Sequence, residues 1–582
     1  MRAMQSAGLL AAGVLLSSAC GSLPGSTSDA RSADLMVYGR VWTGDSARPW
    51  AQAVAVAGDT ILAVGDSATL ARLIGTTTRV LRNGAAMVVP GFMEGHAHLL
   101  SGGLQLASVD LRDASSPSEL IARIKAHAAT LHPGEWITGG GWDHERWPGA
   151  PLPERSWIDS VTPNNPVFVS RLDGHMALAN TAALRQAGIS RATREIIGGT
   201  IVRNPRTGEP TGALKENARA PVDRVVPSPS ATQVDSALAR AMRWAVARGV
   251  TAAATLSDDP GPMAVARSWG ELAGLKRAHR QGAMPIRVAL YVSLEAWHAM
   301  ADTLKNDGPG DAWLRAAGVK GFVDGSLGSK TALFDQPYND APETRGLMVT
   351  PEDSLRAWIG GADSAGLQVA VHAIGERANG LLLDIYDSIG RAHGPRDRRF
   401  RIEHVQHLRR PDIARLARSG VVASMQPYHL PDDGRWAEKR IGSERIKTTY
   451  PFRSLLDDGA RLAFGSDWTV APIDPLLGIY AAVTRRTLDG KHPNGWVPEE
   501  KISVEQALRA YTSGNAYGVF AEGTRGKLAP GYLADLVLLD RDLTAIEPET
   551  IDRVTVLVTV VGGKVVFQRP ADSASVASKP GR

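Results

Sequence analysis

Short apolar runs alternate with amphipathic segments along most of this chain. Each run has seven or eight residues and predicts a buried strand; the runs cover residues 85–92, 249–255, 286–292, 318–324, 367–373, 399–406, 421–427 and 461–467. Segments between them, such as PSELIARIKAHAATL and DSALARAMRWAVARG, space their apolar residues as helices do. Eight strands alternating with helices predict an α/β fold, a (β/α)8 barrel, with a doubly wound open sheet as the alternative.

An insertion separates the first two of these strands. The gap between residues 94 and 248 is far too long for one strand–helix unit. Within it, the runs WITGGGWD (136–143) and PVFVSRLDGH (166–175) predict extra strands. We expect this insertion and the loops at the barrel rim to form the substrate pocket.

Two β-rich ends flank the barrel region. Residues 34–88 and 533–568 alternate short apolar bursts with Gly and Asp, as hairpins do. Neither end alone offers much core, so we expect both to pair as one small β-sandwich domain. The predicted organisation is a signal peptide (1–19), a lipidated tether (20–33), the two parts of the β-sandwich (34–88 and 522–568), the barrel (89–521) and a flexible tail (569–582).

The composition and charge argue against one class of function, nucleic-acid binding. The 582 residues are 43% hydrophobic and 21% charged, as is ordinary for a soluble globular protein. The net charge of +5 is spread along the chain, without a basic run or interleaved aromatic residues. This distribution argues against nucleic-acid binding.

The first residues have the shape of a secretory signal. Arg2 precedes an apolar run from Ala7 to Leu16 that is too short to span a bilayer, and small residues follow it. The stretch LSSAC resembles a bacterial lipobox with Ala19 before the cleavage point, which implies that Cys20 becomes a lipidated first residue. The alternative is a signal peptide with an unrelated cysteine. We expect a periplasmic or outer-membrane-anchored lipoprotein, because two or more acyl chains anchor a protein stably.

A histidine pair follows the first apolar run, in the stretch PGFMEGHAH. Residues two apart in an extended chain point to the same side, so His96 and His98 would direct their imidazoles at one point. Two neutral imidazoles at a strand end form half of a divalent metal site. Two surface histidines in a loop are the alternative.

Other polar residues occur where predicted strands end. Catalytic groups of (β/α)8 barrels lie at the C-terminal strand ends. The residues near those positions are His96, His98, Lys320, His372, His404 and Asp467. Four histidines and an aspartate that converge on one rim predict a metal site rather than a set of core histidines.

The motifs around these residues resemble a known family. PGFMEGHAH, VKGFVDGSLGSKTALF, VAVHAIGERAN, RIEHVQ, SMQPYH and FGSDWTV are similar to the metal-dependent amidohydrolase superfamily. GKLAPGYLADLVLLD and VVGGKVVF match its small β-sandwich, and DGSLGS and HAIGE place the chain near family 3, in the branch of N-substituted formamide deformylases. The resemblance covers nearly everything after residue 34. It is specific for the metal site and much less so for the substrate.

The resemblance implies a role for each residue at the rim. His96 and His98 bind a first metal and His372 and His404 a second. Asp467 ligates the first metal and contacts the nucleophilic water. In related enzymes the lysine is carbamylated, which turns a cation that two metals would repel into a bridging anion. Lys320 as an exposed strand-end lysine, with a single metal in the site, is the alternative.

The expected chemistry follows from these ligands. Imidazole and carboxylate ligands suit zinc, with manganese, iron or cobalt as alternatives. A metal makes hydroxide available near neutral pH and polarises a carbonyl, while Asp467 passes the water's proton to the leaving nitrogen. We expect hydrolysis of an amide or related C–N bond, other than a peptide bond, in a small-molecule substrate.

Four further residues are expected to contact that substrate: His175, Gln406, His429 and Trp468. His175 lies in RLDGHMALAN, a family motif that faces the active site. The chain departs from this branch at the second strand, where relatives usually carry a His-Asp pair and this sequence has Ala254 and Thr255. That departure leaves the substrate class open.

Two rival functions remain at this point. An esterase or lactonase would use the same activated hydroxide on a C–O bond. A non-catalytic metal-binding surface lipoprotein would keep the barrel as a binding module, although the intact ligand set argues against it. The expected partners are the small-molecule substrate and a membrane reached through the lipid anchor, with a possible homo-oligomer and no nucleic acid.

Overall fold

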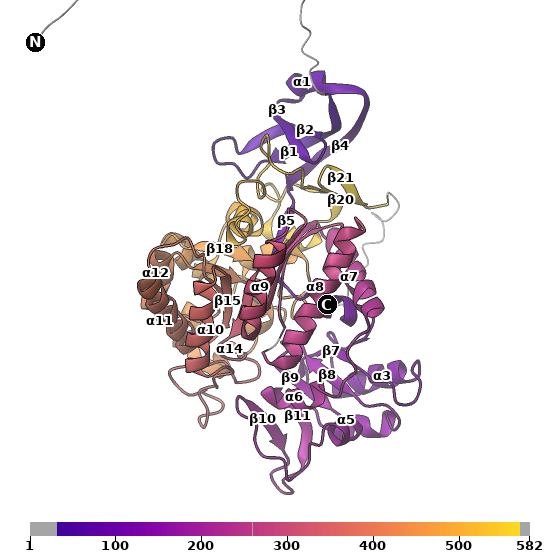
Figure 1. Cartoon of the computed structure of the whole chain (residues 1–582), viewed down its shortest axis with the longest axis vertical. Coiled ribbons are helices and arrows are strands. Elements are labelled where there is room, and N and C mark those ends of the chain that lie inside the picture. The colour runs from indigo at the N-terminus through magenta and orange to yellow at the C-terminus, as the bar shows by residue number, and fades with distance from the viewer. Residues whose placement is uncertain (1–31, 259, 571–582) are drawn as a thin grey trace, which may run out of the picture.

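The computed structural model of the chain describes residues 32–258 and 260–570. These residues form three parts arranged along the long axis of the molecule (Figure 1). A β-rich part built from both ends of the chain lies at one end, the barrel lies in the middle, and the inserted part lies at the other end. The predicted α/β fold is confirmed.

The barrel consists of eight parallel strands in sequence order. They are β5 (Phe92–Ala97), β12 (Val250–Leu256), β13 (Arg287–Ser293), β14 (Leu314–Phe322), β15 (Gln368–Ala373), β16 (Arg401–His404), β17 (Val422–Met425) and β18 (Arg461–Phe464). Every residue of β5, β12, β13, β15, β16 and β17 is buried. Parallel strands covered on both faces are continuously apolar, which explains the runs in the sequence.

The first and last strands close the barrel next to the predicted ligands. The Asp467 amide donates to the His96 carbonyl oxygen at 2.7 Å, and the His98 amide donates to the Trp468 carbonyl oxygen at 2.7 Å. Closure therefore requires the backbone just after β18 to lie against the His-Ala-His segment. The bonds that complete the sheet also hold His96, His98 and Asp467 together.

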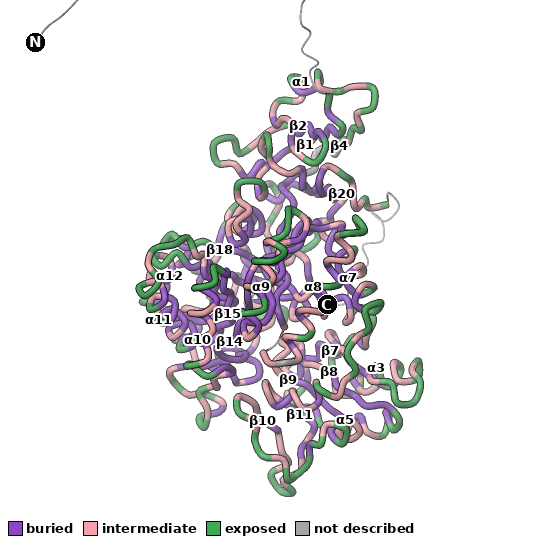
Figure 2. The backbone as a smooth tube through the Cα atoms, viewed as in Figure 1, coloured by how far each residue is buried: buried purple, intermediate pink, exposed green. Residues whose placement is uncertain are grey.

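Helices cover the outside of the barrel and present their apolar faces to it. They are α7 (Ala231–Val246), α8 (Pro262–Arg280), α9 (Trp297–Asp307), α10 (Glu352–Ser364), α11 (Glu376–His393), α12 (Arg410–Ser419), α15 (Phe452–Asp457), α16 (Pro475–Thr484) and α17 (Val504–Arg509). In α7 the buried residues recur three and four apart, and a capping box of Ser230 and Gln233 begins the helix. Figure 2 shows buried residues concentrated along the middle of the molecule and exposed ones on the outer helices.

The β-rich part is a seven-stranded sheet to which both chain ends contribute. Its order is β21-β20-β19-β4-β1-β2-β3, with bounds β1 (Ala33–Trp42), β2 (Trp50–Ala57), β3 (Thr60–Gly65), β4 (Ile74–Pro90), β19 (Leu536–Leu539), β20 (Val556–Val561) and β21 (Lys564–Gln568). One expectation is corrected here. The run 85–92, predicted as the first barrel strand, lies mostly in β4, which pairs with β1 and β19, and the barrel begins with β5. The apolar run is continuous across the end of β4 and the start of β5, so the pattern alone could not separate the two strands.

The insertion is a sheet with its own helices. Its strands are β6 (Val109–Asp110), β7 (Gly139–Trp142), β8 (Phe168–Arg171), β9 (Met176–Ala179), β10 (Gly199–Arg203) and β11 (Pro210–Glu216), accompanied by α3 (Pro117–Ala128), α5 (Thr181–Gln186) and α6 (Ala220–Asp223). The strands predicted in 136–143 and 166–175 are confirmed as β7 and β8. The short helix α2 (Leu99–Gln105) joins the barrel to this insertion.

The predicted signal peptide and Cys20 lie outside the described residues. Among the helices that the structure does describe, none combines the length and the apolar character needed to cross a bilayer.

Candidate metal centre

The strand ends bring His96, His98, Lys320 and Asp467 together at one rim of the barrel. Asp467 Oδ1 lies 2.8 Å from His98 Nε2 and 3.2 Å from His96 Nε2. Lys320 Nζ lies 3.4 Å from His96 Nε2. The residues come from β5, β14 and the segment after β18, so the barrel assembles groups that are hundreds of positions apart in sequence.

The other two predicted histidines complete the cluster. The ring centroid of His404 lies 4.3 Å from that of His372 and 5.1 Å from that of His96. His372 Nε2 lies 3.2 Å from the Gly325 carbonyl oxygen, a geometry that suits donation by Nε2–H and leaves the lone pair on Nδ1. All six predicted residues therefore meet at one centre.

The donor set fits a divalent cation. The ligand atoms of His96, His98 and Asp467 lie within 4.8 Å of one another, and so do those of His404, His429 and Asp467. His404 Nδ1 and His429 Nε2 are buried and have no hydrogen-bond partner in the described structure. Buried imidazole nitrogens with unused lone pairs beside a carboxylate are what a divalent metal requires. Asp467 belongs to both groups and so lies between two candidate positions.

His429 was predicted to contact the substrate, and the structure gives it a second possible role. Its Nε2 lies 3.9 Å from Asp467 Oδ2 and shares a ligand group with His404. His372, expected to pair with His404 on a second metal, is next to His404 but belongs to neither group. The segment that carries His429 starts α13 (His429–Asp433) directly after β17.

Two carboxylates orient the histidines of β5. Glu403 Oε2 lies 2.7 Å from His96 Nδ1, which assigns the proton to Nδ1 and leaves Nε2 toward the centre. His98 Nδ1 lies 2.7 Å from Asp258 Oδ1 and 2.9 Å from the Leu256 carbonyl oxygen, which orients His98 in the same sense. Glu403 therefore acts as a structural partner of His96.

Burial and charge set the protonation of these groups. Burial lowers the pKa of His96 to about 4, with Lys320 adding to the effect. Burial also holds the pKa values of His372 and His404 well below their ordinary range. These three imidazoles are neutral at pH 7, the form that binds metals.

The pair of His98 and Asp467 behaves differently. Burial opposes charge on His98, but the carboxylates of Asp258 and Asp467 outweigh it and raise the pKa of His98 well above its ordinary value. The pKa of Asp467 is correspondingly held well below its ordinary value by His96 and His98, against the effect of burial. Metal binding at His98 Nε2 would therefore release a proton.

The backbone is strained at two of the candidate ligands. His404 has φ 80° and Asp467 has φ 56°, both in the left-handed region that residues with a Cβ rarely adopt. Such conformations persist only where the surrounding structure determines them, and they cluster at functional sites. Here the strain follows the ends of β16 and β18, where each side chain is turned toward the centre.

Lys320 is buried, not exposed at a strand end. Its side chain is 1% exposed, its Nζ lies 3.4 Å from His96 Nε2, and the salt bridges of the described residues include none to it. Burial lowers its pKa to about 8, so about one-tenth of the amine is unprotonated at pH 7, far more than for a lysine with its ordinary pKa. An unpaired buried lysine beside four imidazoles calls for a compensating modification or ligand.

The remaining predicted residues differ in their placement. His175 lies with its ring 5.1 Å from that of His372, and Glu216 Oε2 lies 2.9 Å from its Nδ1. Gln406 lines a small cavity beside the centre. Trp468 corrects an expectation: it is 5% exposed, packs in the core against Gly102, and is absent from the described lining of both cavities at the centre.

A cavity of ≈ 1210 Å³ opens above the centre. Its lining includes the six predicted rim residues and, from the insertion, Trp136, Phe168 and Arg171. The insertion therefore helps to build the cavity above the centre, where we expected it to contribute to a substrate pocket. A cavity of this size accepts a drug-sized molecule and exceeds what a bare formyl group needs.

One residue at the centre, Asp258, was not among the residues predicted from the sequence. Asp258 follows β12, near the position where relatives of the branch carry a His-Asp pair and this chain has Ala254 and Thr255. It is an acidic residue just beyond a strand end, the same signal that identified Asp467. Its carboxylate supplies the contact to His98, so the departure in sequence does not leave that ligand without support.

Comparisons with known proteins agree with this geometry. A model described as the amidohydrolase family matches residues 84–567. The Arabidopsis thaliana protein LONG AFTER FAR-RED 3 is 42% identical over 92% of each chain, and the N-substituted formamide deformylase of Arthrobacter pascens is 28% identical over 92% of this chain and 98% of its own. A crystal structure of an uncharacterized metal-dependent hydrolase from Pyrococcus horikoshii is 29% identical, covers 88% of this chain and 99% of its own, and superposes with a TM-score of 0.70. The chain therefore belongs to the amidohydrolase family, as the match over residues 84–567 shows and as the barrel with its histidine-rich rim agrees.

Proposed function

We propose that this protein is a metal-dependent hydrolase that cleaves an amide or a related C–N bond other than a peptide bond. The observation that carries the proposal is Asp467 Oδ1, 2.8 Å from His98 Nε2 and 3.2 Å from His96 Nε2 within a buried cluster of imidazoles. Family membership supports a hydrolase, and the similarity to an N-substituted formamide deformylase supports the choice of a C–N bond.

Zinc is the proposed metal, because imidazole nitrogens and one carboxylate dominate the donor set. His96, His98 and Asp467 would hold one ion, and His404 with His372 or His429 would hold a second. When bound, zinc lowers the pKa of a water molecule and polarises the substrate carbonyl.

The side chains then have distinct tasks. The Asp467 carboxylate accepts a proton from the attacking water, whose oxygen bonds to the carbonyl carbon. As the C–N bond breaks, Asp467 returns this proton to the leaving nitrogen. His175, whose ring lies 5.1 Å from that of His372, is placed to hydrogen-bond the carbonyl oxygen.

We further propose that Lys320 is carbamylated. Its unprotonated amine would bond to the carbon of CO2 and lose one proton, which replaces a buried cation by an anion with two ligand oxygens. The burial of Lys320 beside the imidazoles of the centre supports this, because a buried ammonium is costly and a carbamate would be compensated by the metal ions that it helps to hold. Protein equilibrated with 13C-bicarbonate should show a carbamate carbonyl resonance that Lys320→Arg lacks. Identical spectra for the two proteins would refute the modification.

The cellular placement is a proposal from sequence alone. Residues 1–19 would direct export, and Cys20 would carry the acyl chains that hold the enzyme at the periplasmic side of a membrane. The substrate would then be a small molecule of that compartment.

Matched substrates test the proposed function. Zinc-loaded protein is assayed on an N-substituted formamide and on the formate ester with a leaving group of equal pKa. We expect zinc-dependent cleavage of the formamide that chelation abolishes and added zinc restores. Faster cleavage of the ester would favour an esterase, and protein that holds no metal tightly would overturn the proposal.

A further inference from the structure

A second, smaller cavity adjoins the metal centre on the side of α13. It has a volume of ≈ 50 Å³, and its lining includes His404, His429 and Asp467 of the centre together with Asp433 and Trp436. We call this space the side pocket. Because its lining includes Asp467, a substrate held at the centre can extend a small group into it.

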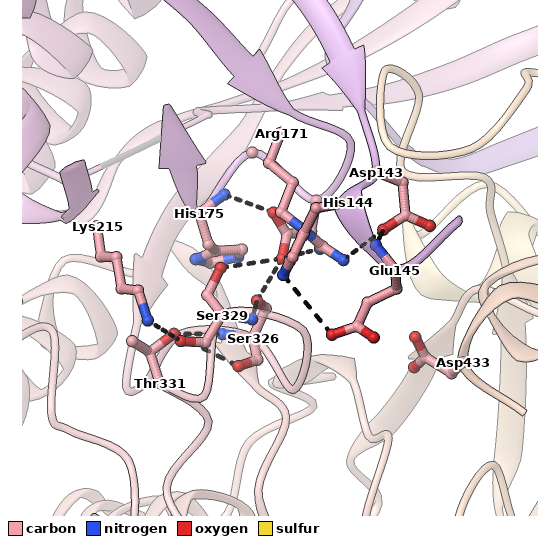
Figure 3. Close-up of polar contacts among 12 residues, drawn as sticks. Asp143, His144, Glu145, Arg171, His175, Lys215, Ser326, Ser329, Thr331 and Asp433 are labelled. Carbon is pink, nitrogen blue, oxygen red and sulfur yellow. Dashed lines mark hydrogen bonds and ion pairs between the residues drawn. The ribbon is translucent and has the colours of Figure 1, made fainter. Parts of the chain in front are cut away.

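The charges around the side pocket are mostly paired. Arg171 binds Asp143 at 2.9 Å and Asp173 at 2.7 Å. Arg435 binds Asp143 at 2.8 Å and Asp432 at 3.1 Å. Figure 3 shows the contacts that Arg171 makes from β8. Three carboxylates thus share two guanidinium groups, which leaves this part of the lining slightly negative before Asp433 is counted.

Asp433 has no cationic partner among the described residues. Its Oδ2 accepts from Gln406 Nε2 at 2.5 Å and from the Tyr450 hydroxyl at 2.6 Å, both neutral donors. Its Oδ1 makes no hydrogen bond within the described structure. Figure 3 shows Asp433 near the network of Arg171 with no dashed line joining it to the other residues drawn. Burial raises the pKa of Asp433 to about 7, as expected for a carboxylate that lacks a counter-ion.

A second unpartnered group lies in the same lining. Trp436 is 8% exposed, and its indole Nε1 is buried without a hydrogen-bond partner in the described structure. Buried indole N–H groups normally find an acceptor. The side pocket therefore contains an uncompensated carboxylate and an unused donor within a few residues of each other, and native proteins retain few such groups without a reason.

We propose that the side pocket binds a cationic amino group of the substrate, with Asp433 as its counter-ion. This inference rests on the proposed function and specifies its substrate class: an amide or formamide that also carries a small ammonium group. A neutral group would leave the half-buried Asp433 carboxylate without a counter-ion, whereas an ammonium at Oδ1 pairs it directly. The small volume limits the group to an ammonium on a short chain.

The orientation of Asp433 supports this role. Gln406 and Tyr450 both bind Oδ2, so they hold the carboxylate in place while leaving Oδ1 for a third donor. Gln406 follows His404 by two residues on the segment after β16. The position of the counter-ion is thereby tied to that of a candidate metal ligand.

Binding of simple probes tests the inference without any reaction. Metal-loaded full-length protein is titrated with propylammonium chloride and with propan-1-ol, which has a similar shape and no charge, by ligand-observed NMR at pH 8. We expect the wild type to bind propylammonium about tenfold more tightly than propan-1-ol, and Asp433→Asn to bind both about equally. Asp432→Asn is the matched control, because it removes a neighbouring carboxylate that Arg435 already pairs; it should keep most of the preference.

The outcomes separate this inference from the proposed function. Equal binding of the two probes by the wild type overturns the inference and needs no variant to fold. A preference that Asp433→Asn retains also overturns it. A preference that Asp433→Asn loses supports the side pocket even if the wild type hydrolyses no amide, in which case the proposed function alone fails. If formamides are cleaved, kcat/KM should favour an aminoalkyl formamide over its alkyl counterpart in the wild type and not in Asp433→Asn.

Discussion

The contact between Glu403 and His96 offers a sharp test of the proposed metal centre. Glu403 is fully buried and binds His96 Nδ1 at 2.7 Å and Arg401 Nε at 2.7 Å. Glu403→Gln keeps the size and shape of the side chain while it removes the charge. It leaves Arg401 without its counter-ion and leaves one neutral acceptor oxygen in place of two charged ones, so Arg401 and His96 must compete for it.

The magnitude follows from these two contacts. Breaking a buried ion pair by neutralising one partner costs about 3–5 kcal/mol of unfolding free energy. Arg401 keeps its bonds to the Gly95 carbonyl at 2.7 Å and the Ser424 hydroxyl at 3.0 Å, so we expect the lower end, about 3 kcal/mol. Replacing the charged partner that orients a metal-bound histidine by a neutral one should weaken metal affinity by about 10-fold, the lower end of the range for such partners.

The pH dependence has a definite sign. Although burial opposes it, Arg401 and His96 hold the pKa of Glu403 below its ordinary value of 4.5. Glu403 therefore stabilises the fold above pH 4.5, and this contribution is lost as the pH falls from there toward the folded-state pKa. The Glu403→Gln protein should lose less stability than the wild type over that acidic range.

The assay combines denaturant unfolding of metal-free protein with competition titration of zinc. Metal-free protein is used for unfolding because bound metal would add its own stabilisation. Glu352→Gln serves as the control, since Glu352 pairs with Arg356 on the exposed face of a helix and should change stability by less than about 0.5 kcal/mol. If Glu403→Gln matched this control in both stability and zinc affinity, the role assigned to Glu403 would be wrong.

Three further predictions concern other parts of the molecule. Asp467→Asn should lower kcat/KM by about 10²–10⁴-fold, because it removes the proposed proton carrier. The control Asp458→Asn, on an exposed turn, should leave kcat/KM unchanged. Wild-type activity in Asp467→Asn would contradict the mechanism. Asp535→Asn should lower the unfolding free energy by about 3 kcal/mol, because Asp535 pairs with buried Arg287 at 2.7 Å across the contact between the barrel and the small sheet; an unchanged denaturation midpoint would count against that contact. Cys20→Ser should move the exported protein from the detergent phase to the aqueous phase in Triton X-114 partitioning, whereas an aqueous wild type would exclude the lipid anchor.

The sequence by itself determined which residues could meet. A strand alternates its side chains with a period of two, so His96 and His98 had to share a side wherever the strand lay. Strand–helix alternation predicted a parallel barrel, and a parallel barrel places the C-terminal ends of all its strands at one rim. These two regularities were enough to bring Lys320, His372 and Asp467 to the same centre, because both depend on local pattern and chain order.

Tertiary structure alone decided which of two adjacent buried segments entered the barrel, which carboxylates orient the histidines, and where Trp468 lies. The apolar run 85–92 continues from β4 into the start of β5, and only pairing with distant strands separates the two segments. Asp258 reaches His98 and Glu403 reaches His96 through the paths of loops and the register between strands, which no local pattern specifies. The sequence could not identify Asp433 as a candidate site for the same reason. Whether a carboxylate has a counter-ion depends on which cationic side chains lie near it in the folded protein.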